Sequence, residues 1–129
     1  DNLVCTCLLR GCIRTNALLR SAEVADTAKA AGNYGVQATF QGIDMTQVNK
    51  YQDSVVDKLY MGLTGLVSSK NITFVQGEGR MTGPKQVTVG TDVYEGKNLV
   101  LATGSISKTL GIEITGRVIT SDQATRPRC

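Results

Sequence analysis

Two cysteines near the start of the chain have the spacing of a candidate redox pair. Cys7 and Cys12 are separated by four residues, and an apolar pattern with a period close to 3.6 begins at Cys12. A helix start presents unpaired N–H groups and the positive end of the backbone dipole, which favour thiolate over thiol. Because the thiolate is the nucleophile of disulfide exchange, this position suits redox chemistry.

Other interpretations of the two cysteines stay open on spacing alone. Free cysteine is a common small core residue, so Cys7 and Cys12 could simply pack inside the protein. As a structural disulfide, so short a loop would contribute only about 2 kcal/mol. A zinc site would need Cys5 and Cys129, since the chain has no histidine. We therefore expect no metal site.

Composition limits the possible partners. The 129 residues suffice for one domain with a core, and 41% are hydrophobic and 19% charged. A net charge of +3 is too weak and dispersed to indicate nucleic-acid binding. No apolar run approaches the roughly 20 residues of a membrane span, and no secretory signal is recognisable. We expect a cytoplasmic protein that binds neither nucleic acid nor membrane.

Two helices should position the cysteines. The first is expected over 12–31, with Gly32 and Asn33 as its C-terminal cap. The second should begin at Asp44, with Gln47 completing a capping box, and run to 68–69. Its expected apolar stripe consists of Met45, Val48, Val55, Leu59, Leu63 and Leu66.

The second half of the chain changes to a strand-like pattern. The expected strands are 72–75, 86–89, 93–95 and 99–102. Gly83 and Pro84 indicate a turn, and 90–92 should form a three-residue hairpin connection. The run 99–102 is continuously apolar, as in a strand covered on both faces. The expected fold is therefore α/β, or α+β within this segment: two helices followed by a small antiparallel meander and a buried strand.

Two glycine-containing turns are weak candidates for ligand contacts. Gly104 follows the expected buried strand and lies beside Thr103, whose hydroxyl could hydrogen-bond a ligand. Gly77 and Gly79 offer a similar close approach of backbone. Each glycine could equally serve its own turn, and the chain lacks the glycine spacing of a specific phosphate loop.

Several stretches together resemble the dihydrolipoamide dehydrogenases, above all the actinobacterial type, among the flavin-dependent pyridine nucleotide disulfide oxidoreductases. Their order and spacing match this family as far as about residue 124. The matching stretches are 6–13, 17–19, 60–63, 77–79 and 101–105.

The resemblance implies roles for both cysteines. Cys7 would exchange with the dithiol substrate, and Cys12 would contact the flavin. Electrons would pass from dihydrolipoamide, carried by an acyltransferase partner, to the disulfide, then to FAD and then to NAD. The remaining residues implied to lie at the cofactor are Thr6, Asn16, Glu78, Gly79, Ala102, Thr103 and Gly104.

The sequence also departs from the family pattern. Val4 and Cys5 stand where the family has a glycine pair, Arg14 replaces a proline, and Asn16 replaces a lysine near the flavin. A proline expected between residues 110 and 111 is also missing. The chain has no histidine, although the family's catalytic base is a histidine of its dimerisation domain.

These matches and departures lead to one main expectation and one alternative. Residues 1–129 should be part of a Rossmann-like FAD-binding domain of a homodimeric enzyme, inactive and marginally stable on its own or associated with another chain. The alternative is a catalytically silent binding or structural domain derived from the same family.

Overall fold

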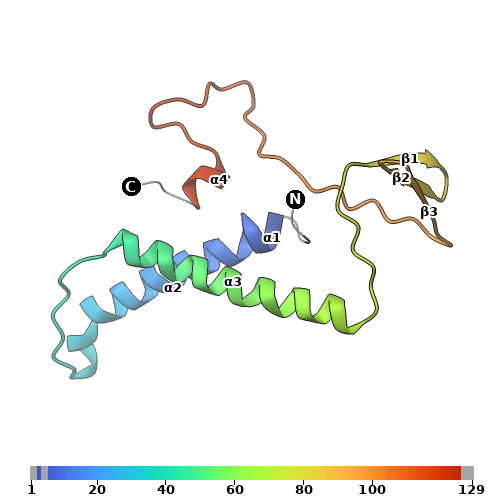
Figure 1. Ribbon diagram of the computed structural model, residues 1–129. Helices are drawn as coiled ribbons and strands as arrows, with labels where there is room; N and C mark the ends of the chain where they lie inside the picture. The colour runs from blue at the N-terminus through green and yellow to red at the C-terminus, as the bar shows by residue number, and fades with distance from the viewer. Residues whose placement is uncertain (1–2, 4–5, 126–129) are drawn as a thin grey trace.

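The structure is a computed structural model that describes residue 3 and residues 6–125. It consists of a helical part, a small sheet and a long irregular segment that leads to a final helical turn (Figure 1). The elements are α1 (Thr6–Leu9), α2 (Cys12–Lys29), the 3-10 helix η1 (Ala31–Tyr34), α3 (Met45–Ser69), β1 (Gly79–Gly83), β2 (Gln86–Val89), β3 (Asp92–Glu95) and α4 (Ser121–Ala124).

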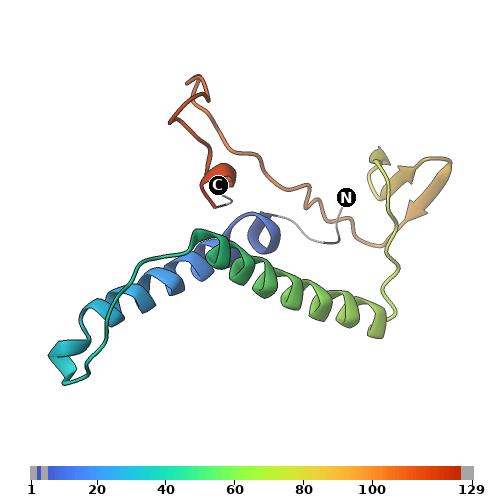
Figure 2. The ribbon, with the colours of Figure 1, turned by 60° about the vertical axis from the view of Figure 1, so that its left-hand side comes forward.

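The helices α2 and α3 pack against each other and contain most of the buried side chains (Figure 2). Those of Ala17 and Ala25 on α2 are small, which lets α3 approach closely, and Val56 on α3 is 3% exposed. The predicted start of α3 is confirmed, because the Asp44 carboxylate accepts hydrogen bonds from the backbone N–H of Thr46 at 2.8 Å and of Gln47 at 3.3 Å.

The end of the first helix differs from the prediction. α2 stops at Lys29, two residues early, and continues into η1. Gly32 and Asn33, predicted as the cap, lie inside η1, and the left-handed capping residue is Gly35 with φ of 73°. Because the chain continues in the tighter 3-10 geometry after α2, it reverses direction at the following glycine, Gly35.

The buried face of α3 is rotated relative to the predicted stripe. Val48, Val55 and Leu63 are half-buried as expected. The other three members of the stripe, Met45, Leu59 and Leu66, are exposed. The centre of the face is formed by Val56 and by a polar residue, Gln52, which is 1% exposed.

The sheet is a three-stranded antiparallel meander in the order β1-β2-β3. The predicted turn at Gly83 and Pro84 is confirmed between β1 and β2. The hairpin connection has two residues rather than three, because Asp92 pairs with Val89. Gly90 supplies the positive φ, 61°, that a tight hairpin turn needs.

Two predicted strands are not formed. Residues 72–75 and 99–102 have no regular secondary structure, and Phe74 and Val100 are 52% and 83% exposed. A strand is stable only when a neighbour satisfies its backbone groups, and no described strand lies beside either segment. The expected buried strand at 99–102 is therefore wrong for this structure, whereas the order of two helices followed by an antiparallel meander is confirmed.

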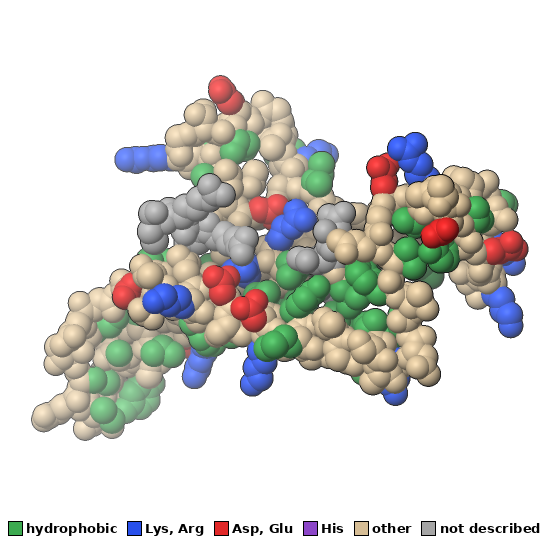
Figure 3. Space-filling view, viewed as in Figure 1, with side chains coloured by type: hydrophobic (Ala, Val, Ile, Leu, Met, Phe, Trp, Pro, Cys, Tyr) green, Lys and Arg blue, Asp and Glu red, His purple; other side chains and the backbone are tan. Residues whose placement is uncertain are grey.

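The sheet lies apart from the helices. Among the described residues no strand contacts a helix, and apolar side chains are in view on the sheet and beside α3 (Figure 3). The exposed ones include Leu59, Met61 and Leu66 on α3 and Met81 and Val93 on the sheet. In the part of the chain that the structure describes, no helix combines the length and hydrophobicity of a bilayer crossing.

Candidate redox site

The two candidate cysteines lie on adjoining helices at one corner of the helical part. Cys7 is the second residue of α1, and Cys12 is the first residue of α2. Gly11 is the N-terminal cap residue of α2, and the backbone N–H of Arg10 donates to the Thr6 carbonyl at 2.9 Å. Both cysteine side chains are exposed, so a solvent-borne thiol can reach either one. Neither cysteine therefore packs in a core formed by the described residues.

Gly11 brings the start of α2 against the backbone of α1. A Cβ atom at this position would lie 3.1 Å from the Thr6 carbonyl oxygen and 3.6 Å from the Cα of Cys7. The first of these distances is shorter than an ordinary van der Waals contact. The absence of a side chain at Gly11 therefore allows the residue before Cys12 to lie close to the Thr6 carbonyl at the start of α1.

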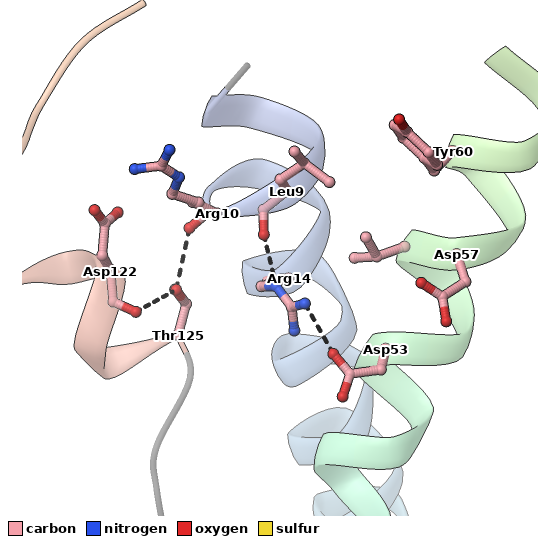
Figure 4. A pocket seen from close by; sticks show the side chains of 9 residues that line it. Leu9, Arg10, Arg14, Asp53, Asp57, Tyr60, Asp122 and Thr125 are labelled. Carbon is pink, nitrogen blue, oxygen red and sulfur yellow. Dashed lines mark hydrogen bonds and ion pairs between the residues drawn. The ribbon is translucent and has the colours of Figure 1, made fainter. Parts of the chain in front are cut away.

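The turn between the two cysteines is held by Arg14, whose side chain is almost fully buried. The Arg14 Nε donates to the Leu9 carbonyl at 2.7 Å, and its second terminal nitrogen lies 2.8 Å from the Asp53 carboxylate of α3 (Figure 4). Arg14 was noted in the sequence only as a replacement for proline. Here it connects the cysteine turn to α3.

The turn that follows α4 and ends at Thr125, here called the C-terminal turn, contacts the carbonyl group of Arg10. The Thr125 hydroxyl lies 3.1 Å from the Arg10 carbonyl oxygen, and it shares its single proton with the carbonyl oxygens of Ser121 at 3.1 Å and Asp122 at 3.4 Å (Figure 4). Gln52 donates through Nε2 to the Arg14 carbonyl at 3.0 Å and to the Thr125 carbonyl at 3.3 Å, while its buried Oε1 accepts no hydrogen bond from the described residues. Gln52 therefore joins α2 to the C-terminal turn.

The short helix α4 places Thr125. The backbone N–H of Thr120 donates to the Gln123 side chain at 2.8 Å, and the backbone N–H of Gln123 donates back to the Thr120 hydroxyl at 3.4 Å. This capping box fixes the turn that ends at Thr125. It is visible in the sequence as Thr-x-x-Gln, and that pattern could have predicted the helix.

A cavity of about 690 Å³ opens between α1, α3 and the C-terminal turn. It is lined by Leu9, Arg10, Arg14, Asp53, Val56, Asp57, Tyr60, Asp122 and Thr125 (Figure 4). Neither cysteine belongs to this lining. Within the described residues, no group of three or more histidine, cysteine or acidic side chains converges as metal ligands would.

The predicted cofactor residues lie in three separate segments. Thr6 is half-buried at the start of α1, and Asn16 is exposed on α2. Glu78 precedes β1 and forms an exposed ion pair with Arg80 at 2.9 Å, and Gly79 opens β1. The third segment, 102–104, is exposed and irregular. Val4, Cys5 and Cys129, which were also considered in the sequence, lie outside the described residues.

The glycines of these segments have local structural roles. A Cβ at Gly77 would overlap a methyl group of Val89, and one at Gly79 would lie 3.3 Å from a methyl group of Val87. Both glycines therefore let the chain pack against β2. Gly104 has a φ of 85° with open space around it, so its glycine is required by the backbone conformation of that turn.

The described residues do not by themselves form a cradle for FAD. The predicted cofactor residues line neither the cavity beside α1 nor the more apolar groove between α2 and the loop that precedes α3. In addition, Asn16 offers an uncharged amide at the position where the resemblance expects a lysine. A binding site for FAD would need further protein groups.

Comparison with known proteins decides the family. A match to the family described as pyridine nucleotide-disulphide oxidoreductase covers residues 3–128. The chain belongs to this family. Pyridine nucleotide-disulphide oxidoreductases of this kind use FAD, with NAD as the partner substrate. The family predicted from the sequence is thus confirmed.

Several curated relatives within the pyridine nucleotide-disulphide oxidoreductases match almost the whole chain. It is 37% identical to a dihydrolipoyl dehydrogenase of Bacillus subtilis, over 92% of this chain and 28% of that protein. It is 35% identical to a mitochondrial dihydrolipoyl dehydrogenase of Pisum sativum, over 90% and 25%, and 33% identical to a leghemoglobin reductase of Vigna unguiculata, over 90% and 24%. The chain spans about a quarter of the length of these relatives.

Proposed function

We propose that this chain carries the redox-active cysteine pair of a dihydrolipoamide dehydrogenase and is part of its FAD-binding domain. The observation that supports this most directly is the placement of Cys7 and Cys12, both exposed on adjoining helices at one corner, with Gly11 close to the backbone of α1. Membership of the family and about 35% identity to dihydrolipoyl dehydrogenases point in the same direction.

The proposed reaction of the chain's own residues is a dithiol exchange. A thiolate of dihydrolipoamide attacks the Cys7 sulfur of the Cys7–Cys12 disulfide, and the Cys12 sulfur leaves as a thiolate. The second thiol of dihydrolipoamide then attacks the mixed disulfide, which releases the cyclic disulfide lipoamide and leaves two reduced cysteines. Two electrons and two protons are thereby transferred from the substrate to the protein.

The complete enzyme of this proposal is longer. FAD and NAD are its onward electron acceptors, and protein groups outside the described residues complete the FAD site around Thr6, Asn16, Glu78, Gly79 and 102–104. Homodimer formation, a lipoyl-carrying acyltransferase as partner and a cytoplasmic location belong to the same proposal. A reducing compartment suits a catalytic disulfide of this kind, because cytosolic disulfides in mesophiles are mostly transient and catalytic.

The exchange can be tested without the cofactors. The oxidised chain with Cys5→Ser and Cys129→Ser is mixed with dihydrolipoamide, and free thiols are trapped by alkylation and counted by mass spectrometry. We expect one equivalent of lipoamide per chain and a faster reaction for the folded chain than for the same chain unfolded in urea. Replacing Cys7 or Cys12 by serine should abolish it.

The same experiment distinguishes the alternative, a catalytically silent domain. Such a domain has no reason to present the disulfide better than an unfolded peptide does. Equal rates for the folded and the urea-unfolded chain would therefore contradict the proposed function and support the silent domain.

A further inference from the structure

The backbone between the two cysteines is held from outside the turn at two successive carbonyl groups. The Leu9 carbonyl accepts from the Arg14 side chain at 2.7 Å, and the Arg10 carbonyl lies 3.1 Å from the Thr125 hydroxyl, whose proton it shares with carbonyls of the turn before Thr125. Both donors lie outside the Cys7 to Cys12 segment. Arg14 is a local donor that a tertiary ion pair with Asp53 holds in place, whereas Thr125 reaches the turn from more than a hundred residues away in sequence.

Arg14 is suited to this role because its guanidinium is itself fixed. The residue is 4% exposed, and its terminal nitrogen lies 2.8 Å from the Asp53 carboxylate. A planar guanidinium presents several donors in a rigid arrangement, so one side chain can serve Leu9 and Asp53 at the same time. Proline, which the resemblance expects at this position, has no side-chain donor. The support of the turn therefore depends on the guanidinium of Arg14.

Gln52 completes the support from α3. Its amide donates to the backbone carbonyls of Arg14 and Thr125, and Gln52 is 1% exposed. The two residues that hold the cysteine turn are therefore connected to each other through a single buried side chain. Movement of the turn would have to break hydrogen bonds to α2, α3 and the C-terminal turn together.

We propose that Arg14, held by Asp53, is a positioning residue that sets how readily Cys7 and Cys12 form their disulfide. Two cysteines can be bridged only when their Cα atoms lie within about 7 Å of each other. A fixed turn restricts the chain between the two cysteines in the reduced protein, so less conformational freedom is lost when the bond forms. This inference rests on the proposed function, because it concerns the same pair.

The disulfide equilibrium with glutathione measures this effect. One oxidised glutathione converts the two thiols to the disulfide and yields two reduced glutathiones. In the Cys5→Ser, Cys129→Ser chain we expect Arg14→Lys to lower the equilibrium constant at least about tenfold, the lower end of the scale of one lost charge-assisted hydrogen bond. Lysine keeps the positive charge but has a single nitrogen, which cannot reach Leu9 and Asp53 in the guanidinium geometry.

Arg20→Lys is the matched control, because Arg20 lies on the same helix and forms only an exposed pair with Glu23 at 2.7 Å. Its equilibrium constant should equal that of the parent chain. Thr125→Val removes the donor to the other carbonyl and should also lower the constant. Circular dichroism of each variant checks that the helices remain. If Arg14→Lys loses helicity, the equilibrium constants of Thr125→Val and Asp53→Asn are used instead to test the positioning role.

The outcomes separate the two proposals. Unchanged constants in the folded Arg14→Lys and Thr125→Val chains would overturn the positioning role and leave the proposed function intact. If the parent chain forms no Cys7–Cys12 disulfide at any ratio of oxidised to reduced glutathione, both proposals are wrong.

Discussion

At the scale of residues, the candidate site depends on polar contacts of the backbone as much as on the cysteines. Gly11 allows the start of α2 to lie close to the Thr6 carbonyl, while Arg14 and Thr125 contact the carbonyls of the intervening turn. Such contacts are energetically significant, since a hydrogen bond to a charged group contributes about 1.5–3 kcal/mol. The corner should therefore be sensitive to changes that leave both thiols in place.

Gly11→Ala tests the close approach at this corner. The added Cβ would lie 3.1 Å from the Thr6 carbonyl oxygen, and relief of this contact requires the backbone of α1 to move. We expect the free energy of unfolding of the helices, from urea titration followed by circular dichroism, to fall by about 1–3 kcal/mol.

Gly62→Ala is the control for this substitution. Gly62 lies inside α3, and a Cβ there would meet nothing within 4 Å. The alanine should raise the stability of the helix by about 1 kcal/mol, because it favours helical backbone relative to glycine. A destabilisation of the same size at both positions would refute the specific role of Gly11.

At the scale of elements, helix starts were easier to predict than the faces and strands. The Asp44 cap follows from local sequence, since its carboxylate binds N–H groups only two and three residues away. The buried face of α3 depends on how α2 crosses it, and this crossing placed Gln52 at the centre. A polar residue at helical spacing between Val48 and Val55 was the available signal for a buried amide.

Asp44→Ala should weaken α3 by removing its N-terminal cap. Loss of the hydrogen bonds to Thr46 and Gln47 is expected to cost about 1 kcal/mol in urea unfolding monitored through helicity. Asp57 is an exposed position within the same helix, and Asp57→Ala should leave the free energy of unfolding unchanged or raise it slightly. The capping role is wrong if the two variants unfold at the same urea concentration.

At the scale of the whole molecule, the chain is open. It exposes 10437 Å² of surface, whereas a compact protein of 13.7 kDa exposes about 6,600 Å². The buried apolar side chains are few and small. In addition, no described strand pairs with the apolar segments 72–75 and 99–102. This surface agrees with the expectation of marginal stability or association.

Small-angle scattering of the 129-residue chain at several concentrations tests this openness. A compact domain of this length would have a radius of gyration of about 14 Å. We expect a clearly larger value at high dilution, or a rise in apparent mass with concentration as exposed apolar surface is covered by a second chain. A concentration-independent radius near that of a compact monomer would contradict the open arrangement.

The sequence predicted several locally determined features, although the capping box at Thr120 and the end of α2 at Lys29 show that local signals were also missed, and it did not predict what tertiary contacts determine. The cysteine pair, the cap at Asp44 and the turn at Gly83 and Pro84 each depend on neighbours a few residues away. The strand at 99–102 depends on partners far along the chain, and the roles of Arg14 and Thr125 depend on the crossing of α2, α3 and the C-terminal turn. Periodicity and resemblance carry no information about such contacts.

The separation of the sheet from the helices has a consequence for cooperativity. Because no described strand contacts a helix, the two parts are linked only through the chain segments between them, and neither transfers stability to the other. An isolated three-stranded meander is near the lower limit for independent folding. Heating should therefore melt the β1-β2-β3 hairpins before the helices, and a protease that cuts at 71–76 would separate the helices that carry both cysteines from the segment that carries Thr125, so that hydrogen bonds such as those of Gln52 and Thr125, and no longer the chain, would join the two pieces.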